Sequence, residues 1–186
     1  MREVQRARAL IVGNDTIKLT EQDAYTCHNA ALQLAAKGGN PRNNNGHYNR
    51  AIGWHGSMAE FAESISSELA VARYFDMPFD PYEMKFKIKA DVGEILEVKW
   101  THWNDGQLIV HEYDRNSDIA VLVTGTYPYY RLAGWIPVAV AKKDRYKHHS
   151  QPNWWIAQHH LMPIDTLLGS GYAADLLKMS QMQKKD

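Results

Sequence analysis

Three residues with the chemistry of a metal-dependent hydrolase lie close together in the chain. The segment from Asp91 to Lys99 reads Asp-Val-Gly-Glu-Ile-Leu-Glu-Val-Lys, with Glu97 two residues before Lys99. Side chains two residues apart on a β-strand point to the same face, so Glu97 and Lys99 are expected to lie side by side. Val92-Gly93 is a turn signal, and a tight hairpin there would fold the carboxylate of Asp91 back toward Glu97.

These three side chains suit the hydrolysis of a phosphodiester. Two carboxylates supply the hard oxygen ligands that Mg²⁺ and Mn²⁺ prefer. A metal ion held by Asp91 and Glu97 would polarise the phosphate and lower the pKa of a bound water. Lys99 would orient that water, help to deprotonate it, or stabilise the negative charge that develops on the phosphate. A half-exposed structural strand shows the same alternation of charged and apolar residues, so spacing alone leaves both interpretations open.

A glutamate in the preceding helix is a fourth candidate. At about 100° per residue, Glu68 falls within the apolar stripe of this helix, Glu60 lies at its flank and Glu63 faces solvent. A glutamate directed at the core needs a partner, which is either the same metal ion or an arginine or backbone donor. The helix itself is expected over about residues 57–75, because apolar residues recur at helical spacing: Met58, Phe61, Ile65, Leu69 and Ala72.

The rest of the chain predicts helices followed by short strands. A capped helix is expected from Thr20 to Gly38-Gly39, and an Asn/Gly/Pro-rich loop over 40–49. Short connections between the strands favour antiparallel neighbours. Further helical segments are expected over 138–143 and 164–179, and strands over 84–90, 95–101, 108–111, 119–124 and 130–136.

Length and composition favour a single intracellular domain. The 186 residues fit one domain over 1–186, with 1–50 as a helical and loop N-terminal arm. One cysteine, Cys27, provides neither a disulfide framework nor a cysteine zinc site. The N-terminal segment is charged where a secretory signal would be apolar, and no apolar run is long enough for a membrane span. We therefore expect a soluble cytoplasmic protein with no membrane partner.

Net charge restricts how the protein could bind nucleic acid. Lys plus Arg and Asp plus Glu each total 21, so the formal net charge is zero, which argues against a general nucleic-acid coat. Any nucleic-acid contact must then be local. Two segments could supply it: 40–50, with two arginines and no acid, and the mostly basic 142–149. Solvated loops often have such compositions, so either segment could equally be a plain surface.

Histidine and aromatic residues give weaker signals. The adjacent pairs His148-His149 and His159-His160 cannot converge on one ion from a strand or helix, which argues against a zinc site. His102, just past the strand that carries Glu97, is the better candidate for a supporting role, although a surface position is the simpler interpretation. Trp154-Trp155 and 127–130 could stack bases, but aromatic clusters in β-rich segments usually belong to a core or an interface.

Several segments together resemble the PD-(D/E)xK nuclease superfamily, and in detail a group of small phage-encoded proteins of that type. The resemblance covers roughly residues 56–167. It implies a restriction-endonuclease-like α/β fold, with a mixed, largely antiparallel central sheet flanked by helices. It also implies a site of Glu68, Asp91, Glu97 and Lys99. The segments that carry the resemblance are 67–75, 90–93, 96–101, 106–110, 121–125 and 134–136.

Two positions depart from the family pattern. Ala90 stands where the name of the motif has proline, and Ser67 stands where relatives often carry glycine. Related phage sequences include versions that lack the acid or the lysine, whereas this chain retains all four residues. Membership of the superfamily would therefore be compatible with either an enzyme or a protein that has lost catalysis.

The leading hypothesis is a Mg²⁺- or Mn²⁺-dependent nuclease, with DNA favoured over RNA and the metal held by Asp91, Glu97 and Glu68. The alternative is a non-catalytic nucleic-acid- or protein-binding module on the same scaffold. A third, weaker hypothesis is an assembly factor of a phage particle. The sequence separates neither endonuclease from exonuclease activity nor a monomer from a homodimer, and a phage-encoded protein would act in the host cytoplasm.

Overall fold

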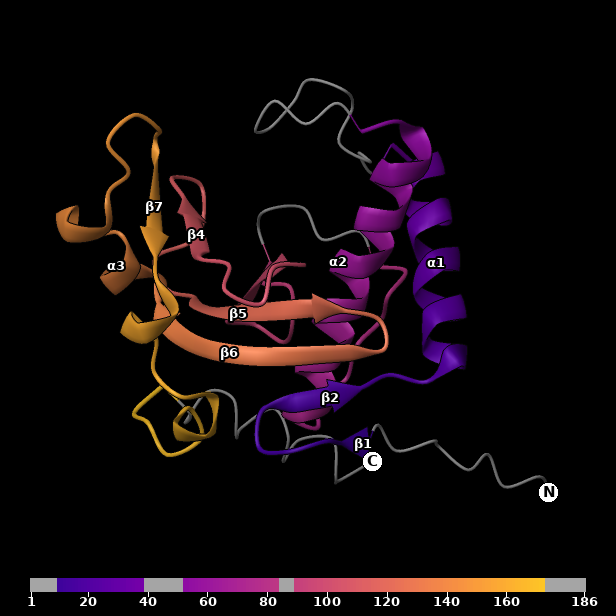
Figure 1. The fold of residues 1–186 in the computed structure, drawn as a ribbon, viewed down its shortest axis with the longest axis horizontal. Coiled ribbons are helices and arrows are strands. Elements are labelled where there is room, and N and C mark those ends of the chain that lie inside the picture. Colours follow the sequence, from indigo (N-terminus) through magenta and orange to yellow (C-terminus); the bar gives the residue numbers. More distant parts are fainter. Residues whose placement is uncertain (1–9, 39–51, 84–88, 173–186) are drawn as a thin grey trace.

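The first long helix of the fold is capped at its N-terminus. The structure, a computed structural model, describes residues 10–38, 52–83 and 89–172 (Figure 1). Helix α1 spans Glu21–Ala36, as the sequence predicts to within two residues. The Thr20 hydroxyl accepts a hydrogen bond from the backbone N–H of Asp23 at 3.2 Å, and the Asp23 carboxylate accepts one from the N–H of Thr20 at 2.8 Å. This capping box satisfies two amide groups that the helix leaves unpaired.

Helix α2 packs along α1 through small residues. It spans Trp54–Tyr74 and so begins three residues before the predicted start. The Arg73 guanidinium of α2 donates to the Asp23 carboxylate of α1, with 2.6 Å between Nη1 and Oδ2, which ties the end of α2 to the start of α1. The shared cluster is mostly small or flexible side chains: Cys27, Ala30, Ala31, Leu34, Met58, Ala62 and Ile65.

The central sheet is mixed and mostly antiparallel. The five strands found in the described residues lie in the order β1-β2-β6-β5-β3, and only β3 and β5 are parallel among these pairs. The expectation of antiparallel neighbours is therefore wrong for β3 and β5, because the intervening β4 leaves this sheet. The strands are β1 (Leu10–Ile11), β2 (Thr16–Lys18), β3 (Leu96–Thr101), β5 (Ile119–Thr126) and β6 (Tyr129–Pro137).

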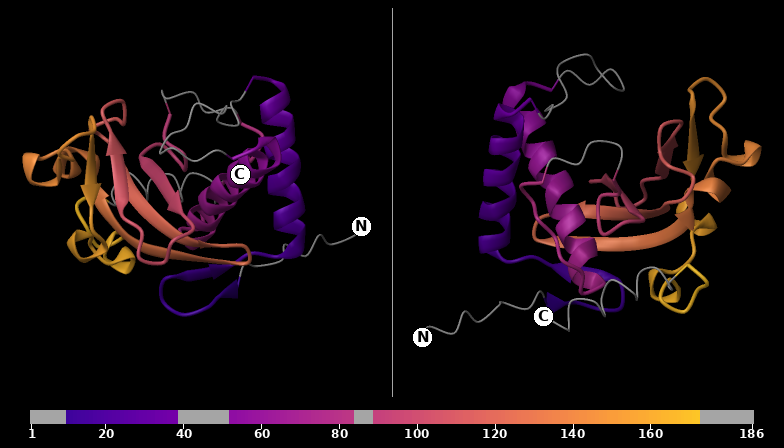
Figure 2. Two further views of the ribbon diagram at one scale, coloured as in Figure 1. Left: turned by 45° about the horizontal axis from the view of Figure 1, so that its top comes forward. Right: turned by 180° about the vertical axis from the view of Figure 1, so that it is seen from behind.

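A second, two-stranded sheet covers the other face of the central one. Its strands are β4 (Leu108–His111) and β7 (Asn153–Ile156), which pair antiparallel and run steeply across β5 and β6 (Figures 1 and 2). Val121 and Val123 of β5 pack in the cluster shared with α2, whereas Ala120 and Leu122 pack in the cluster shared with β4 and β7. Both faces of β5 are thus buried, which explains its unbroken apolar run.

Short helical turns follow the sheet. They are α3 (Val138–Ala141) and the 3₁₀ helices η2 (Asp144–Tyr146), η3 (Gln158–His160) and η4 (Ile164–Thr166). The prediction of a helix over 164–179 is wrong for the described residues, since only η4 forms there before the chain turns. Gly169 and Gly171 disfavour a continued helix there. Residues 173–179 lie outside the described residues, as do 84–88 of the predicted strand 84–90.

Residues 10–38 contribute to both layers. The sequence predicts an N-terminal arm over residues 1–50. In the described part of that segment, β2 pairs with β6 and α1 packs on α2. β1 and β2 were not predicted, because two or three residues are too few for a periodic pattern. The four residues of β7 were not predicted as a strand either. Within the described ranges, no helix combines the length and apolarity needed to cross a bilayer.

Gly125 offers a test of the β5–β6 turn. Its φ is +97°, and an added Cβ would lie 2.7 Å from the backbone oxygen of Tyr129. We expect Gly125→Ala to lower the free energy of unfolding by about 1–3 kcal/mol in urea titrations. Gly171→Ala is the control, because an added Cβ there meets nothing within 4 Å. Equal midpoints for the two variants would contradict this account of the turn.

Candidate active site

A tight hairpin returns Asp91 to the start of β3. Val92 and Leu96 exchange two backbone hydrogen bonds, of 3.0 and 3.2 Å, and Gly93 adopts a positive φ of 60° between them. The Asp91 carboxylate then accepts a hydrogen bond from the backbone N–H of Val98 at 2.7 Å. The hairpin predicted at Val92-Gly93 is therefore present, and it places Asp91 along the outer side of β3.

Glu97 and Lys99 share the face of β3 that is turned away from α2. Leu96 is buried in the cluster shared with α2, which Val98 also contacts. The parallel register places Glu97 beside Ala120 and Lys99 beside Leu122, whose side chains belong to the other cluster. The Lys99 Nζ donates a hydrogen bond to the Glu97 carboxylate at 2.7 Å. The expected alternation of the strand is confirmed.

A buried aspartate that sequence reasoning missed completes this ion cluster. The Asp114 side chain has no exposed surface, and its carboxylate lies 2.9 Å from Lys99 Nζ. It also accepts a hydrogen bond from the backbone N–H of His111 at 2.8 Å. In the sequence, Asp114 stands in a polar run before Asn116 and Ser117, which is ordinary turn chemistry. Its pairing with Lys99 depends on β4 crossing the sheet.

The Lys142 side chain binds the backbone of the same turn. Its Nζ donates to the carbonyl oxygens of Glu112 and Asp114, at 2.9 and 2.6 Å. Arg115, next in the turn, pairs with Asp118 at 2.7 Å and donates to the carbonyl oxygen of Glu94 at 2.7 Å. The turn between β4 and β5 is therefore tied both to α3 and to the hairpin that carries Asp91.

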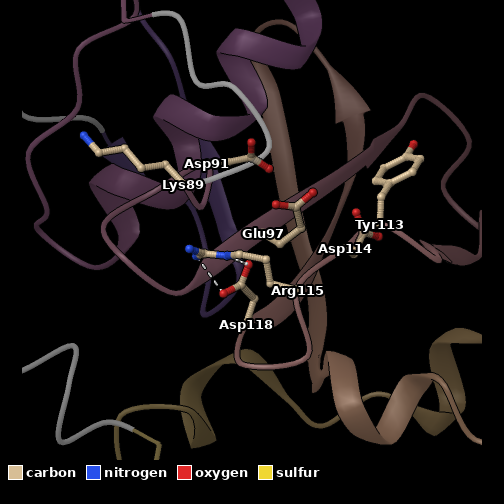
Figure 3. Close-up of a pocket in the computed structure, with 7 residues that line it drawn as sticks. All are labelled: Lys89, Asp91, Glu97, Tyr113, Asp114, Arg115 and Asp118. Atoms are coloured by element: carbon tan, nitrogen blue, oxygen red, sulfur yellow. Dashed lines mark hydrogen bonds and ion pairs between the residues drawn. The ribbon is translucent and has the colours of Figure 1, made fainter.

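The acidic side chains surround a small pocket (Figure 3). The carboxylates of Asp91 and Glu97 lie next to each other at its wall. Its volume of about 50 Å³ accommodates an ion with a few waters but not a nucleotide. The residues that line it are Lys89, Asp91, Glu97, Tyr113, Asp114, Arg115 and Asp118.

The pocket holds more negative than positive charge. The pKa of Glu97 is raised to about 7, mainly by burial and next by the charge of Asp91, while Lys99 opposes the shift. Burial tends to lower the pKa of Lys99, but Glu97 and Asp114 outweigh this effect, so its pKa is raised. Lys99 contacts the carboxylates of Glu97 and Asp114, and the charge of Asp91 also acts on Glu97. A cation bound beside Asp91 and Glu97 would favour the ionised form of both.

Glu68 is not among the residues that line this pocket. It is half-buried on α2, which packs against the Leu96 face of β3 and so lies across the sheet from Glu97. Its charge contributes to the environment of Cys27 instead. Burial is the main cause that raises the pKa of Cys27 to about 11, and Glu68 adds to it. The structure therefore brings together three of the four residues expected from the sequence.

Glu63 does not face solvent as its helical angle predicts. Its carboxylate is half-buried and accepts a hydrogen bond of 2.7 Å from the Tyr130 hydroxyl of β6. α2 packs against α1 on one side and against the sheet on another. The buried arc of the helix is therefore wider than the single stripe assumed from periodicity, and the angular argument is wrong for Glu63.

The pocket offers the oxygen donors that a hard divalent cation requires. Among the residues that the structure describes, no group of three or more His, Cys, Asp or Glu side chains is arranged to hold a metal ion. Mg²⁺ is commonly bound by only one or two carboxylates, with water completing its coordination. Asp91 and Glu97 fit that mode in number and chemistry. His102 contacts the Trp103 ring, at 4.5 Å between centroids, and does not line the pocket.

Comparison of the chain with protein-family models, with curated proteins and with solved structures finds no match. Functional assignment therefore depends on the chemistry of the site itself: two adjoining carboxylates, a lysine bound to one of them, and a buried third carboxylate that holds the lysine.

Removal of the Glu97 charge should change how stability depends on pH. Because its pKa is raised from 4.5 to about 7, the folded protein binds this proton more tightly than the unfolded chain does. The resulting stabilisation is full below pH 4.5 and is lost as the pH rises to about 7. Relative to Glu97→Gln, the wild type should therefore lose about 3 kcal/mol of unfolding free energy across this window.

Urea titrations at pH steps from 4.5 to 8 measure this difference. Glu94→Gln removes an exposed carboxylate three residues away and serves as the control for the loss of one charge. A constant difference between wild type and Glu97→Gln across the range would contradict the burial of Glu97.

Asp114→Asn should destabilise the fold strongly. The substitution leaves the buried ammonium of Lys99 with one carboxylate fewer, which costs about 3 kcal/mol by analogy with other buried pairs. Glu83→Gln breaks the exposed pair with Lys89 and should cost about 0–1 kcal/mol. Urea unfolding at pH 7 compares the two variants, and a cost for Asp114→Asn no larger than that for Glu83→Gln would argue against the buried cluster.

Proposed function

We propose that the protein is a Mg²⁺- or Mn²⁺-dependent nuclease with DNA as its favoured substrate. The observation that carries this proposal is the pocket in which Asp91 and Glu97 adjoin while Lys99 binds Glu97. Asp91 is half-buried and acts on the pKa of Glu97 by its charge, so a cation between the two carboxylates would offset their repulsion. Two adjoining carboxylates are also the oxygen ligands that Mg²⁺ prefers.

Asp91 and Glu97 would hold the metal ion from one wall of the pocket. When bound, the ion would supply Lewis acidity to the phosphate and a lower pKa to its bound water. Asp91 is oriented by the N–H of Val98, and Glu97 by the ammonium of Lys99. We assign no role to Glu68, because it does not line the pocket.

Lys99 would act by its charge. Its raised pKa keeps the ammonium group protonated at neutral pH, which favours stabilisation of the phosphate oxygens over abstraction of a proton from water. Of the three roles that the sequence leaves open, this one agrees best with the contacts to Glu97 and Asp114. Those contacts also limit the orientations that the side chain can adopt.

The dimensions of the pocket indicate how a substrate would lie. A volume of about 50 Å³ excludes the sugar and base, so the phosphodiester would cross the mouth while only its phosphate approaches Asp91 and Glu97. Lys89 and Arg115 are the cationic side chains among the described residues that line the pocket. Both are suited to contact the flanking phosphates.

Incubation of the purified protein with labelled DNA and RNA tests the activity directly. Cleavage is expected with Mg²⁺ or Mn²⁺ and not with EDTA, and Lys99→Ala should lower the rate about 100-fold or more. Lys37→Ala removes an exposed lysine at the end of α1 and is the matched control. A wild-type protein inert on single-stranded, duplex and branched DNA and on RNA, with both metals, would refute the proposal.

A non-catalytic module on the same scaffold is the second candidate. The observation that favours it is the closed ion cluster, in which the Lys99 ammonium already bridges Glu97 and Asp114. Calorimetric titration with Mn²⁺ separates the two candidates. Heat that disappears in Asp91→Asn supports the enzyme, and absence of binding by a folded wild type, with and without DNA, supports the module.

A further inference from the structure

One face of the two-stranded sheet carries aromatic side chains away from the core. The register pairs Ile109 with Trp155 and His111 with Asn153, and directly opposed residues share a face. Leu108, Val110 and Ile156 alternate with these residues and are fully buried in the cluster beneath. His111 and Trp155 are half-buried and lie on the outer face.

These aromatic residues form a row that begins at the pocket. Tyr113 lines the pocket with 55% of its surface exposed, and its ring stacks on His111 at 5.0 Å with 10° between the planes. Trp155 is the diagonal neighbour of His111 across the two strands, which is within reach of large side chains. The Trp155 ring lies 4.7 Å from that of His148. We refer to Tyr113, His111, Trp155 and His148 as the aromatic row.

The pocket end of the row is held in place by the ion cluster. Tyr113 lies between Glu112, whose carbonyl oxygen accepts from Lys142, and Asp114, whose carboxylate accepts from Lys99. The tip of this turn is therefore anchored on both sides of Tyr113. A ring that is already positioned loses little conformational freedom when a ligand stacks on it.

A basic segment borders the far end of the row. Lys147 pairs with Trp154 by an antiparallel bridge, and the N–H of His148 donates to the carbonyl oxygen of Asn153 at 2.9 Å, so Lys147 and His148 lie beside β7. One acid, Asp144, interrupts the run 142–149. Its exposed cationic side chains are Lys143, Arg145 and Lys147.

Aromatic rings beside cations match the chemistry of an unpaired nucleic-acid strand. Such strands bind by stacking their bases on aromatic side chains while basic residues contact the phosphates. A duplex conceals the faces of its bases and presents mainly its phosphates and groove edges. Cations alone would suit both forms, whereas the aromatic row adds a contact that only unpaired bases can use.

We infer that the aromatic row binds a single strand of nucleic acid and directs it to the pocket. The inference rests on the proposed function for what happens at the pocket, and it specifies the substrate class as single-stranded nucleic acid or an unpaired end. A base stacked on Tyr113 would place the adjoining phosphate at the mouth beside Asp91 and Glu97.

Fluorescence anisotropy in EDTA measures binding without cleavage. The probes are a labelled twelve-nucleotide oligo-dT and the same strand annealed to oligo-dA. We expect the single strand to bind about tenfold more tightly than the duplex, and Tyr113→Ala to weaken single-strand binding about tenfold. Tyr113→Phe should retain binding, since it keeps the ring. Tyr25→Ala is the matched control, because Tyr25 is 60% exposed on α1.

The outcomes separate this inference from the proposed function. Binding of duplex at least as tight as binding of the single strand would overturn it, as would equal affinities of Tyr113→Ala and Tyr25→Ala or no binding of either probe. If the single strand binds through Tyr113 but no metal supports cleavage, the inference about the aromatic row is supported and the nuclease proposal fails. If DNA is cut while Tyr113→Ala changes neither affinity nor rate, the nuclease proposal is supported and the inference about the aromatic row fails.

Discussion

The bridge from Lys99 to Glu97 and Asp114 joins the two sheets beside the candidate site. Glu97 belongs to β3 in the central sheet, and Asp114 belongs to the turn that follows β4 in the second sheet. A single ammonium group therefore sets the position of one sheet relative to the other beside the pocket. Because the Asp114 carboxylate is wholly buried, rearrangement would require an unpaired charge in the interior.

The path of β4 explains why this bridge can form. β4 leaves the central sheet after β3 and pairs with β7, in the sheet that covers the face carrying Glu97 and Lys99. The chain then enters β5, which runs parallel to β3, so the turn before β5 lies at the start of β3. The turn with Asp114 consequently arrives beside the first residues of β3, where Glu97 and the Asp91 hairpin lie.

Much of the local structure could be predicted from the sequence. The Thr20 cap, the two long helices, the Val92-Gly93 turn and the alternation from Leu96 to Thr101 all follow from signals contained within a few residues. Such signals depend on backbone chemistry and on a single buried face. Local signals of this kind predict an element correctly when its pattern has one clearly apolar face.

The rest depends on contacts between distant segments. Glu63 and Glu68 were assigned to faces of a helix that turned out to be covered on two sides, so one angular stripe could not place them. Asp114 has its partner Lys99 fifteen positions earlier in the chain, and only the crossing of β4 brings the two together. The parallel pairing of β3 with β5 arises from the same crossing. Nuclease function remains a proposal that these contacts support.

The hydrogen bond between Asp91 and Val98 has a consequence for association between molecules. Among the described strands, β3 is the outermost in the order of the central sheet, and an outermost strand offers its free amide groups to any extended chain that approaches. The Asp91 carboxylate occupies the N–H of Val98 in the middle of that strand and brings a negative charge beside it. The same carboxylate that we propose for cation binding therefore disfavours edge-to-edge pairing of β3 with another chain.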